Sequence, residues 1–381
     1  LTLETYSLSF HSARLCVILI FLLMLHVLRI PRIFMSREIL LYCFFVGYMF
    51  IALFWTIDLR MSMNTLVPAI NFIFVMILFG SLMKYHNQKI VLSGTFFGFI
   101  VAAMYYTISY GFPFVIPEKF SYNAVALMYL SGLFVILVMV NYARSKNMLI
   151  IISFFLAMLI LATTSIKTNL GIVSGVVSGI IFSARMKSIR SKMLIKRFLS
   201  QSTVACMAIL IFFLIIVSSN TLNERIHDGI KRVSIGVKIL ETQENVQGYG
   251  SVELRTEWAE QGLSGWMNNP IFGHGVEAFR YDFGKTSHAT PVDLLYNFGL
   301  IGFLLFYSIF ISIVRRLFLL RKLSHGYIPS LIFGTLVCFF IITLAGTMYY
   351  NSSLAFFIAV SVALISSKTM QLSIPKNKGF L

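Results

Sequence analysis

The chain has 381 residues, of which 58% are hydrophobic and 12% are charged, whereas an ordinary soluble domain is about 45–50% apolar and about 25% charged. So few charges cannot cover a surface that faces water, which excludes a soluble globular enzyme. The formal net charge of +17 would suggest nucleic acid as the partner of a soluble protein. In a chain this apolar it indicates orientation in a bilayer, so we expect contact with membrane lipid and no nucleic acid.

Eleven apolar windows predict membrane-spanning helices. Helices are required because lipid offers backbone groups no other partner, and because the windows lack the period-two alternation of a barrel strand. The expected fold class is therefore an all-α integral membrane protein. The windows lie near residues 13–28, 39–56, 65–83, 90–109, 125–142, 148–165, 168–184, 202–219, 292–314, 328–347 and 353–367.

Clusters of Lys and Arg predict which helix ends face the cytoplasm. With the basic segments 185–197 and 315–322 inside, the inner loops and C-terminus hold 20 of the 31 basic residues but one acidic residue, Glu38. The outer side holds the other 11 basic residues and 13 of the 14 acidic ones, as the positive-inside rule requires. The resulting parts are spans one to eight in 1–219, an outer loop in 220–291, and three spans with a cytoplasmic tail in 292–381.

This topology places the N-terminus outside, where the chain starts at Leu1 without a signal-peptide pattern in its first ten residues. A missing initial helix would explain that start and would raise the number of spans to twelve. A noncanonical start codon or an eleven-span protein is the alternative.

The outer loop at 220–291 is the one long hydrophilic segment, so we expect function to be concentrated there. No span carries a charged residue near its middle, which counts against an ion-coupled transporter. Residues 221–241 predict an amphipathic helix, which is either an ordinary packing helix or one that lies on the membrane surface or over a cavity. A second helix is predicted from Ser251 to about Met267, and the turn from Asn269 to Gly275 shapes a pocket wall or is only structural.

Two basic residues are candidates for holding an anion. Arg255 lies in the first turn of the predicted second helix, where a counter-anion would be favourable; the alternative is a pair with Glu253 or Glu257, or a solvated side chain. Residues 148–184 predict a tight helical hairpin, with one long kinked helix as the alternative. Lys167 lies at the outer end of this pair, where it snorkels to the interface or joins Arg255 on the same anion. Two basic groups and a helix start would suit a diphosphate.

His288 is the candidate general base. Thr290 and Asp293 have capping-box spacing and Pro291 suits a first helical residue, so the ninth span is predicted to start at about Pro291. The N–H groups of that start favour an anion and a neutral imidazole, which is what a base requires; the alternative is a surface or hydrogen-bonding histidine. Arg280, Asp293 and Trp258 are supporting candidates, and neither the cysteines nor the histidines have metal-ligand spacing, so no metal or cofactor is expected.

The ordered motifs resemble the signature of the O-antigen ligase and O-antigen polymerase superfamily. The similarity covers most of the chain as a many-span layout, and residues 160–310 as motifs, including the Ser-x-basic hairpin at Lys167. The matching residues are Leu254-Arg255, Trp258, Asn269-Pro270, Gly273-His274-Gly275, Ser287-His288, Leu294-Leu295 and Gly299-Leu300-Ile301-Gly302.

The resemblance implies a metal-independent glycosyltransferase of the bacterial inner membrane, with the C-type membrane glycosyltransferase arrangement and its site on the periplasmic face. The donor would be a glycan on undecaprenyl diphosphate. Arg255 and Lys167 would hold the diphosphate, and His288 would deprotonate the acceptor hydroxyl. The chain departs from the family in having Lys167 where Arg is usual, which lacks the planar fork, and Ala289 where Asn often follows the histidine.

Three functions remain open. We expect an O-antigen polymerase, whose acceptor is a lipid-linked repeat and whose partners would include a chain-length co-polymerase, because the segment between Pro270 and His288 is short. An O-antigen ligase, whose acceptor is the lipid A core, is the first alternative. A lipid or polysaccharide transporter is the second.

Overall fold

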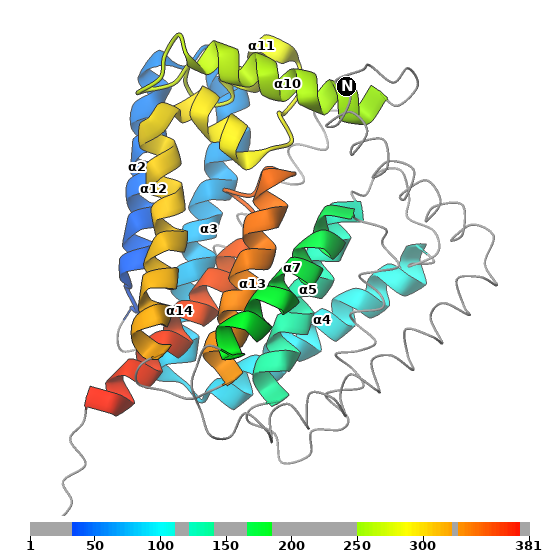
Figure 1. Cartoon of the computed structure of the whole chain (residues 1–381), viewed down its shortest axis with the longest axis vertical. Coiled ribbons are helices and arrows are strands. Elements are labelled where there is room, and N and C mark those ends of the chain that lie inside the picture. Colours follow the sequence, from blue (N-terminus) through cyan, green and yellow to red (C-terminus); the bar gives the residue numbers. More distant parts are fainter. Residues whose placement is uncertain (1–32, 111–121, 141–165, 185–249, 322–326, 374–381) are drawn as a thin grey trace, which may run out of the picture. The chain divides into compact units, whose positions relative to one another are not determined.

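The computed structural model describes residues 33–110, 122–140, 166–184, 250–321 and 327–373, and within these ranges the chain forms helices and no strand (Figure 1). The chain divides into two compact units. The first unit comprises Leu1–Val91, Gly262–Leu320 and Gly346–Leu381, and the second comprises Leu92–Gln261 and Arg321–Ala345. This helical architecture confirms the expected all-α class.

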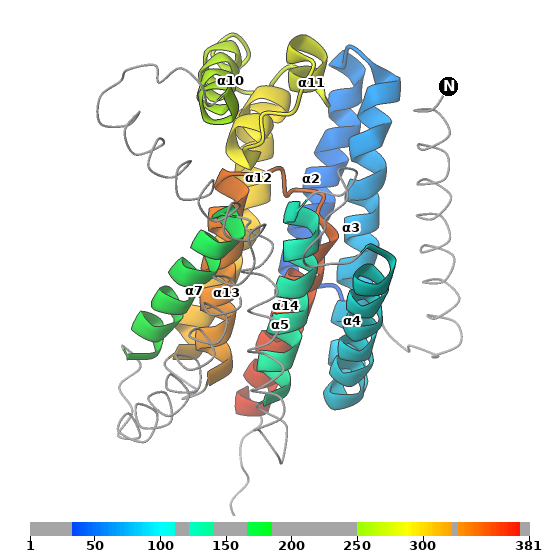
Figure 2. The same cartoon turned by 90° about the vertical axis from the view of Figure 1, so that its right-hand side faces the viewer.

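In the described part of the first unit, three helices are long and apolar enough to cross a membrane: Arg37–Trp55, Leu59–Tyr85 and Thr290–Leu320. They are α2 (Arg37–Ala52) with its short extension η1 (Leu53–Trp55), α3 (Leu59–Tyr85) and most of α12 (Thr290–Arg321). Figures 1 and 2 show them side by side with α14 (Ser352–Ser373), and α11 (Ala278–Phe283) lies beside the start of α12.

Side-chain caps start the first two helices. The Ser36 hydroxyl accepts from the Ile39 N–H at 3.2 Å, and the Asp58 carboxylate accepts from the Met61 N–H at 3.0 Å. Each cap satisfies one of the N–H groups that a helix start leaves without an internal partner. Asp58 therefore fixes the point at which the chain turns from α2 into α3.

The contacts at the two ends of the first unit agree with the predicted alternation of spans. At one end, Arg316 near the end of α12 binds Glu38 at the start of α2, with 3.0 Å between Nη1 and Oε2. At the other end, Thr56 after α2 donates to the Val276 carbonyl at 2.9 Å, and Val276 precedes α12. Thus α2 runs antiparallel to α12, as expected if Glu38 and Arg316 are on one side of the membrane.

The connection between α13 (Tyr327–Leu344) and α14 lies inside the first unit. The Tyr349 side chain is fully buried, and its ring meets Phe45, Phe298 and Phe306 edge-on at 6.0–6.4 Å. Tyr42 of α2 donates to the Tyr349 carbonyl at 2.6 Å. Non-helical backbone at membrane depth needs such protein partners because lipid supplies none.

The second unit contains α4 from Leu92 onward, α5, α7 and α13, together with most of α10. In α7, Gly171, Gly175 and Gly179 are spaced four apart against α13, and a Cβ on Gly175 would lie 2.5 Å from the Gly334 carbonyl oxygen. Small residues at this spacing let two helix backbones approach closely. The bounds are Gln88–Tyr110 (α4), Tyr122–Val140 (α5), Ile166–Ala184 (α7), Gly250–Trp266 (α10) and Tyr327–Leu344 (α13).

Eight of the eleven predicted windows coincide with helices. The windows 13–28, 148–165 and 202–219, and the amphipathic segment 221–241, lie outside the described residues, so the totals of eleven or twelve spans stay predictions. Several helix ends differ from the windows by a few residues: α3 begins at Leu59 and not near 65, and α7 begins at Ile166 and not near 168. The residues before Ile166 lie outside the described part of the chain, so the tight hairpin and the single kinked helix both stay predictions.

Candidate functional site

The candidate site is built from residues 262–293 of the first unit. The predicted second helix is confirmed as α10, Gly250–Trp266, and its last turns lie against the start of α12. A Cβ on Gly262 would lie 2.5 Å from the Val292 side chain, and one on Gly265 would lie 2.5 Å from the Tyr296 ring. The two glycines therefore let the last turns of α10 pack closely against the first turns of α12.

The turn from Asn269 to Gly275, called the inserted turn below, fills a break in α12. Gly299 has φ 61° and ψ −164°, which is not helical. An unbroken helix would pair the carbonyls of Tyr296 and Asn297 with the N–H groups of Leu300 and Ile301. Instead, these carbonyls accept from the N–H groups of His274 and Gly275, both at 2.9 Å, and the Leu300 and Ile301 N–H groups donate to the Pro270 and Ile271 carbonyls.

Glycine makes this insertion possible. Gly273 has φ +72° and Gly275 has φ +106°, and a Cβ on Gly273 would lie 2.5 Å from the α12 backbone at Asn297. Close backbone approach is what the sequence predicted for this turn. The sequence analysis did not predict the break in α12, although Gly299 inside an apolar window is the signal that could have located it.

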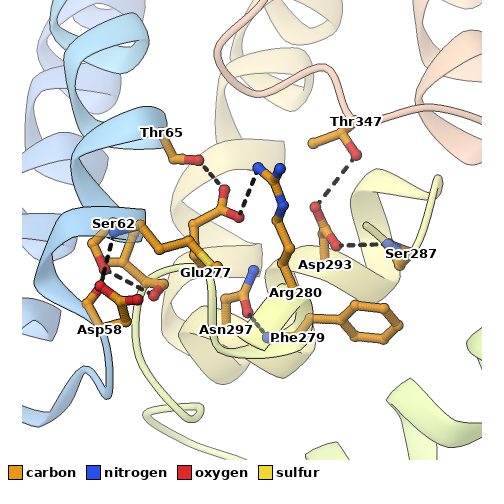
Figure 3. Close-up of polar contacts among 12 residues, drawn as sticks. Asp58, Ser62, Thr65, Glu277, Phe279, Arg280, Ser287, Asp293, Asn297 and Thr347 are labelled. Carbon is orange, nitrogen blue, oxygen red and sulfur yellow. Dashed lines mark hydrogen bonds and ion pairs between the residues drawn. The ribbon is translucent and has the colours of Figure 1, made fainter. Parts of the chain in front are cut away.

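Glu277 is a functional candidate that the sequence analysis missed. Its backbone is left-handed at φ 61° and its side chain is buried. The carboxylate accepts from the Thr65 hydroxyl of α3, and its other oxygen lies 3.9 Å from the Arg280 guanidinium (Figure 3). Burial raises the pKa of Glu277, whereas Thr65 and Arg280 act to lower it. Nothing in the sequence marks a left-handed Glu, because only the contacts with α3 impose that conformation.

Asp293 holds the loop before α12, but not through the predicted capping pair. Its Oδ1 accepts from the Ser287 hydroxyl at 2.7 Å and from the Ser287 N–H at 3.3 Å, and its Oδ2 accepts from Thr347 at 3.3 Å (Figure 3). The Thr290 hydroxyl instead donates to the Gly346 carbonyl at 2.5 Å. The Thr290–Asp293 capping box is therefore wrong, because Thr290 satisfies the buried α13–α14 connection. The helix does start at Thr290, one residue before the predicted Pro291.

His288 is exposed and lies between two residues that are fixed by hydrogen bonds. The Ser287 hydroxyl accepts from the Ala289 N–H at 3.2 Å, and its oxygen lies 2.9 Å from the Ala289 carbonyl oxygen. His288 has φ 56°. Among the described residues other than glycine, Glu277 is the only other one with a positive φ. Such conformations cost about 1–3 kcal/mol and concentrate at functional sites.

Acidic and basic groups along residues 277–293 have different partners. Each acidic side chain accepts from a neutral donor: Glu277 from Thr65, Asp282 from the Tyr296 hydroxyl at 2.6 Å, and Asp293 from Ser287. Glu277 also lies 3.9 Å from Arg280, and Asp282 is exposed. The basic side chains of Arg280, Lys285 and His288 are exposed at the surface. The segment before α12 therefore exposes three basic side chains and one carboxylate, Asp282, to solvent.

The other predicted site residues belong to the second unit. Arg255 and Trp258 are in α10, and Lys167 is in the first turn of α7; the side chains of Arg255 and Lys167 lie outside the described residues. His288, Asp293 and Arg280 belong to the first unit. Convergence of Arg255 and Lys167 with His288 on one anion therefore stays a prediction.

An open pocket of about 560 Å³ lies at the inserted turn. A pocket wall at Asn269–Gly275 was one of the two interpretations that the sequence left open, whereas the contribution of Trp55 and Ile57, at and just after the end of η1, was not predicted. Only the fold brings these two segments together, because more than 200 residues separate them in the chain. The lining residues are Trp55, Ile57, Asn269, Phe272, Gly273 and His274.

Metal ligands do not gather in groups of three or more His, Cys, Asp or Glu in the part of the chain that the structure describes. The groups offered at the surface of the site are basic side chains and the start of α12. Comparison of the chain with protein-family models finds no match, and comparison with curated proteins finds no matching sequence.

Proposed function

We propose that the protein is an inner-membrane glycosyltransferase that transfers a glycan from undecaprenyl diphosphate to a sugar hydroxyl at the periplasmic face. The surplus of basic over acidic groups at the surface of residues 277–293 is the observation that carries this proposal. The buried carboxylates accept mainly from hydroxyl and amide groups, so the exposed Arg280 and Lys285 outnumber the exposed carboxylate of Asp282 in the segment before α12. Such an arrangement suits a doubly or triply charged phosphate group.

In the proposed reaction, the basic groups stabilise the leaving diphosphate. The bond between the anomeric carbon of the donor glycan and the diphosphate oxygen breaks, and the oxygen keeps the electron pair. In this proposal Arg280 and Lys285 neutralise that growing charge, and such electrostatic stabilisation is the largest single contribution in many enzymes. Arg255 and Lys167 are proposed as further diphosphate ligands on the strength of the family resemblance.

His288 is the proposed general base. As the acceptor oxygen bonds to the anomeric carbon, the hydroxyl proton passes to the imidazole, a step typically worth about 10²–10⁴-fold. The adjacent start of α12 disfavours imidazolium and so keeps the ring able to accept a proton. Asp293 is a positioning residue, because it holds Ser287 and through it the backbone on both sides of His288.

The acceptor is proposed to be a lipid-linked repeat unit, which makes the protein an O-antigen polymerase. The argument is the short distance in sequence from Pro270 to His288, which leaves little additional structure for a lipid A core. A ligase would use the same donor and the same basic groups. In a deletion strain, a core capped with a single repeat indicates a polymerase, and a bare core with accumulated lipid-linked chains indicates a ligase.

The decisive assay uses purified full-length protein in lipid nanodiscs with a synthetic undecaprenyl-diphosphate oligosaccharide, with and without EDTA. We expect longer lipid-linked glycans in both conditions, and none with His288→Ala. His227→Ala is the matched control, because it removes an imidazole from the same predicted outer loop but outside the motifs of the resemblance. Normal polymer from a folded His288→Ala variant would refute the assignment of the base.

A further inference from the structure

The pocket at the inserted turn differs in chemistry from the basic segment near His288. We propose that it binds a neutral pyranose ring of a membrane-attached glycan, and so forms a sugar subsite separate from the diphosphate. The choice of a membrane-attached glycan rests on the proposed function; the binding of a sugar ring rests on the pocket itself. Its volume of about 560 Å³ falls within the range of about 300–1,000 Å³ for small-molecule sites.

Flat aromatic surfaces line the pocket. The Trp55 and Phe272 rings meet edge to face, with 6.2 Å between their centroids, and Tyr48 lies 6.3 Å behind Trp55. The Tyr48 hydroxyl donates to the Phe272 carbonyl at 3.0 Å, which joins α2 to the inserted turn. A pyranose ring presents a patch of C–H groups with hydroxyls around its edge, and an aromatic ring with a polar handle suits both parts.

Polar groups of the pocket provide both a donor and an acceptor. The indole Nε1 of Trp55 is buried and, within the described part of the chain, has no hydrogen-bond partner. A buried N–H without a partner is rare in native proteins and calls for an acceptor. A small rotation of the indole on binding would bring this N–H to a sugar hydroxyl, which can accept from the indole and donate to a neighbour at the same time.

His274 supplies the acceptor. Its Nε2 lies 2.9 Å from the Gly265 carbonyl oxygen, and a carbonyl only accepts, so Nε2 carries the hydrogen. In a neutral imidazole, Nδ1 is then left as an acceptor. The ring is held in place by stacking on Tyr296 at 4.6 Å, and the exposed Asn269 amide adds one donor and one acceptor at the rim.

None of the six lining residues is charged. A phosphate or a zwitterionic lipid headgroup would leave its charge without a partner there, whereas a neutral sugar would not. The pocket therefore complements the proposed diphosphate site: one region is basic and the other is aromatic and uncharged.

The position of the pocket favours a ligand attached to lipid. Trp55 ends the candidate span Arg37–Trp55, and the neighbouring Phe54 is 90% exposed while Ile57 and Ile271 are also exposed. Aromatic residues at the end of a span commonly anchor it at the membrane interface. Anchoring explains the exposure of Phe54, but it does not explain the unpartnered buried N–H of Trp55.

Fluorine NMR of the full chain labelled with 5-fluorotryptophan in lipid nanodiscs tests the inference. The chain has three tryptophans, and the Trp55→Phe variant identifies the Trp55 resonance. The probes are maltose, lactose, mannobiose and N,N′-diacetylchitobiose, with sorbitol and glycerophosphocholine for comparison. We expect at least one disaccharide to shift the Trp55 resonance saturably, whereas sorbitol and glycerophosphocholine do not.

Variants locate the binding. Asn269→Ala and His274→Phe are each expected to weaken disaccharide binding about fivefold, the effect of one lost hydrogen bond. Asn268→Ala is the matched control, because this adjacent exposed amide does not line the pocket. The inference is overturned if no disaccharide gives a saturable shift, if glycerophosphocholine shifts Trp55 equally, or if Asn268→Ala is as damaging as Asn269→Ala.

The same preparation separates the two proposals. His288→Ala is expected to abolish glycan transfer and to leave the disaccharide shift of Trp55 unchanged. Disaccharide binding by a wild-type protein that shows no transfer would support the sugar pocket and count against the glycosyltransferase. If the protein transfers glycan but no disaccharide shifts its Trp55 resonance, the glycosyltransferase is supported and the sugar pocket is refuted.

Discussion

Buried carboxylates at the two ends of the first unit have different partners. At one end, Glu38 is fully buried and binds the Arg316 guanidinium at 3.0 Å and the Ser312 hydroxyl at 2.8 Å, so its charge is neutralised inside the protein. At the other end, Glu277 and Asp293 are satisfied mainly by hydroxyl and amide groups. Acids at the second end therefore leave most of the neighbouring positive charge exposed to an external anion.

This difference separates a structural polar cluster from a candidate binding site. Arg316 also donates to Ser366 of α14 at 2.8 Å, so its guanidinium ties three helices together. Arg280 has one weak ion pair, at 3.9 Å, and nearly half of its side chain is exposed. An arginine with its hydrogen bonds used internally holds the fold, whereas one facing solvent can bind a ligand.

The largest expected effect is on stability at the Glu38 end. Arg316→Ala would leave the Glu38 carboxylate buried without its cation, which typically costs about 3–5 kcal/mol. Arg315→Ala is the matched control, because Arg315 is the exposed neighbour in the same helix. Thermal unfolding in detergent should show a clear loss for Arg316→Ala alone. Equal stability of the two variants would remove the distinction between the ends.

Arg280→Ala tests the other end through activity. Loss of its guanidinium is expected to lower the transfer rate about 10²–10³-fold, as for the loss of one transition-state contact, with little change in stability. Arg280→Lys should recover part of the rate, because an ammonium keeps the charge but not the planar fork. Arg60→Ala, at an exposed position in the first turn of α3, provides the control. An unchanged rate in Arg280→Ala would count against the proposed diphosphate site.

Ser287→Ala tests whether Asp293 positions His288. The substitution removes the 2.7 Å bond to Asp293 and the bond from the Ala289 N–H, so the loop should lose about 1–3 kcal/mol of local stability. We expect a lower kcat with little change in KM for the donor, and a broadened His288 NMR signal. Thr286→Ala changes the adjacent side chain and should do neither. A kcat that stays at the wild-type value would make the Ser287–Asp293 contact irrelevant to the reaction.

Glu277 is expected to give the smallest effect, a change in the pH dependence of stability. Because burial raises its pKa, its contribution to stability is fully present below the ordinary carboxyl pKa and is lost as pH rises through the raised value. Unfolding temperatures of wild type should fall from mildly acidic to mildly alkaline pH more than those of Glu277→Gln. If the unfolding temperatures of wild type and Glu277→Gln change with pH by the same amount, Glu277 does not contribute to the pH dependence of stability.

Periodicity and composition predicted the helices well. The windows at 39–56 and 292–314 correspond to α2 and α12, and the start of α12 was placed within one residue. These predictions succeed because lipid allows a long apolar segment little other than a helix. The compact turn at Asn269–Gly275 was also predicted, since Pro and Gly punctuate the chain locally.

The predictions fail where a residue serves a distant segment. Thr290 has the spacing of a cap with Asp293, yet it binds Gly346, more than fifty residues away. Likewise, the break at Gly299 is stable only because the inserted turn supplies the missing hydrogen bonds. Local spacing contains no information about such partners, and the pocket lined by Trp55 and His274 is hidden from sequence for the same reason.

The most direct test measures binding and transfer separately. Undecaprenyl diphosphate is titrated into nanodiscs that contain wild type, Arg280→Ala or His288→Ala, and native mass spectrometry counts bound lipid while inorganic pyrophosphate competes. If Arg280 holds the diphosphate and His288 only removes the acceptor proton, Arg280→Ala loses lipid binding and transfer, whereas His288→Ala binds lipid normally and transfers nothing. Wild-type affinity in Arg280→Ala, or normal transfer in His288→Ala, would contradict the proposed mechanism.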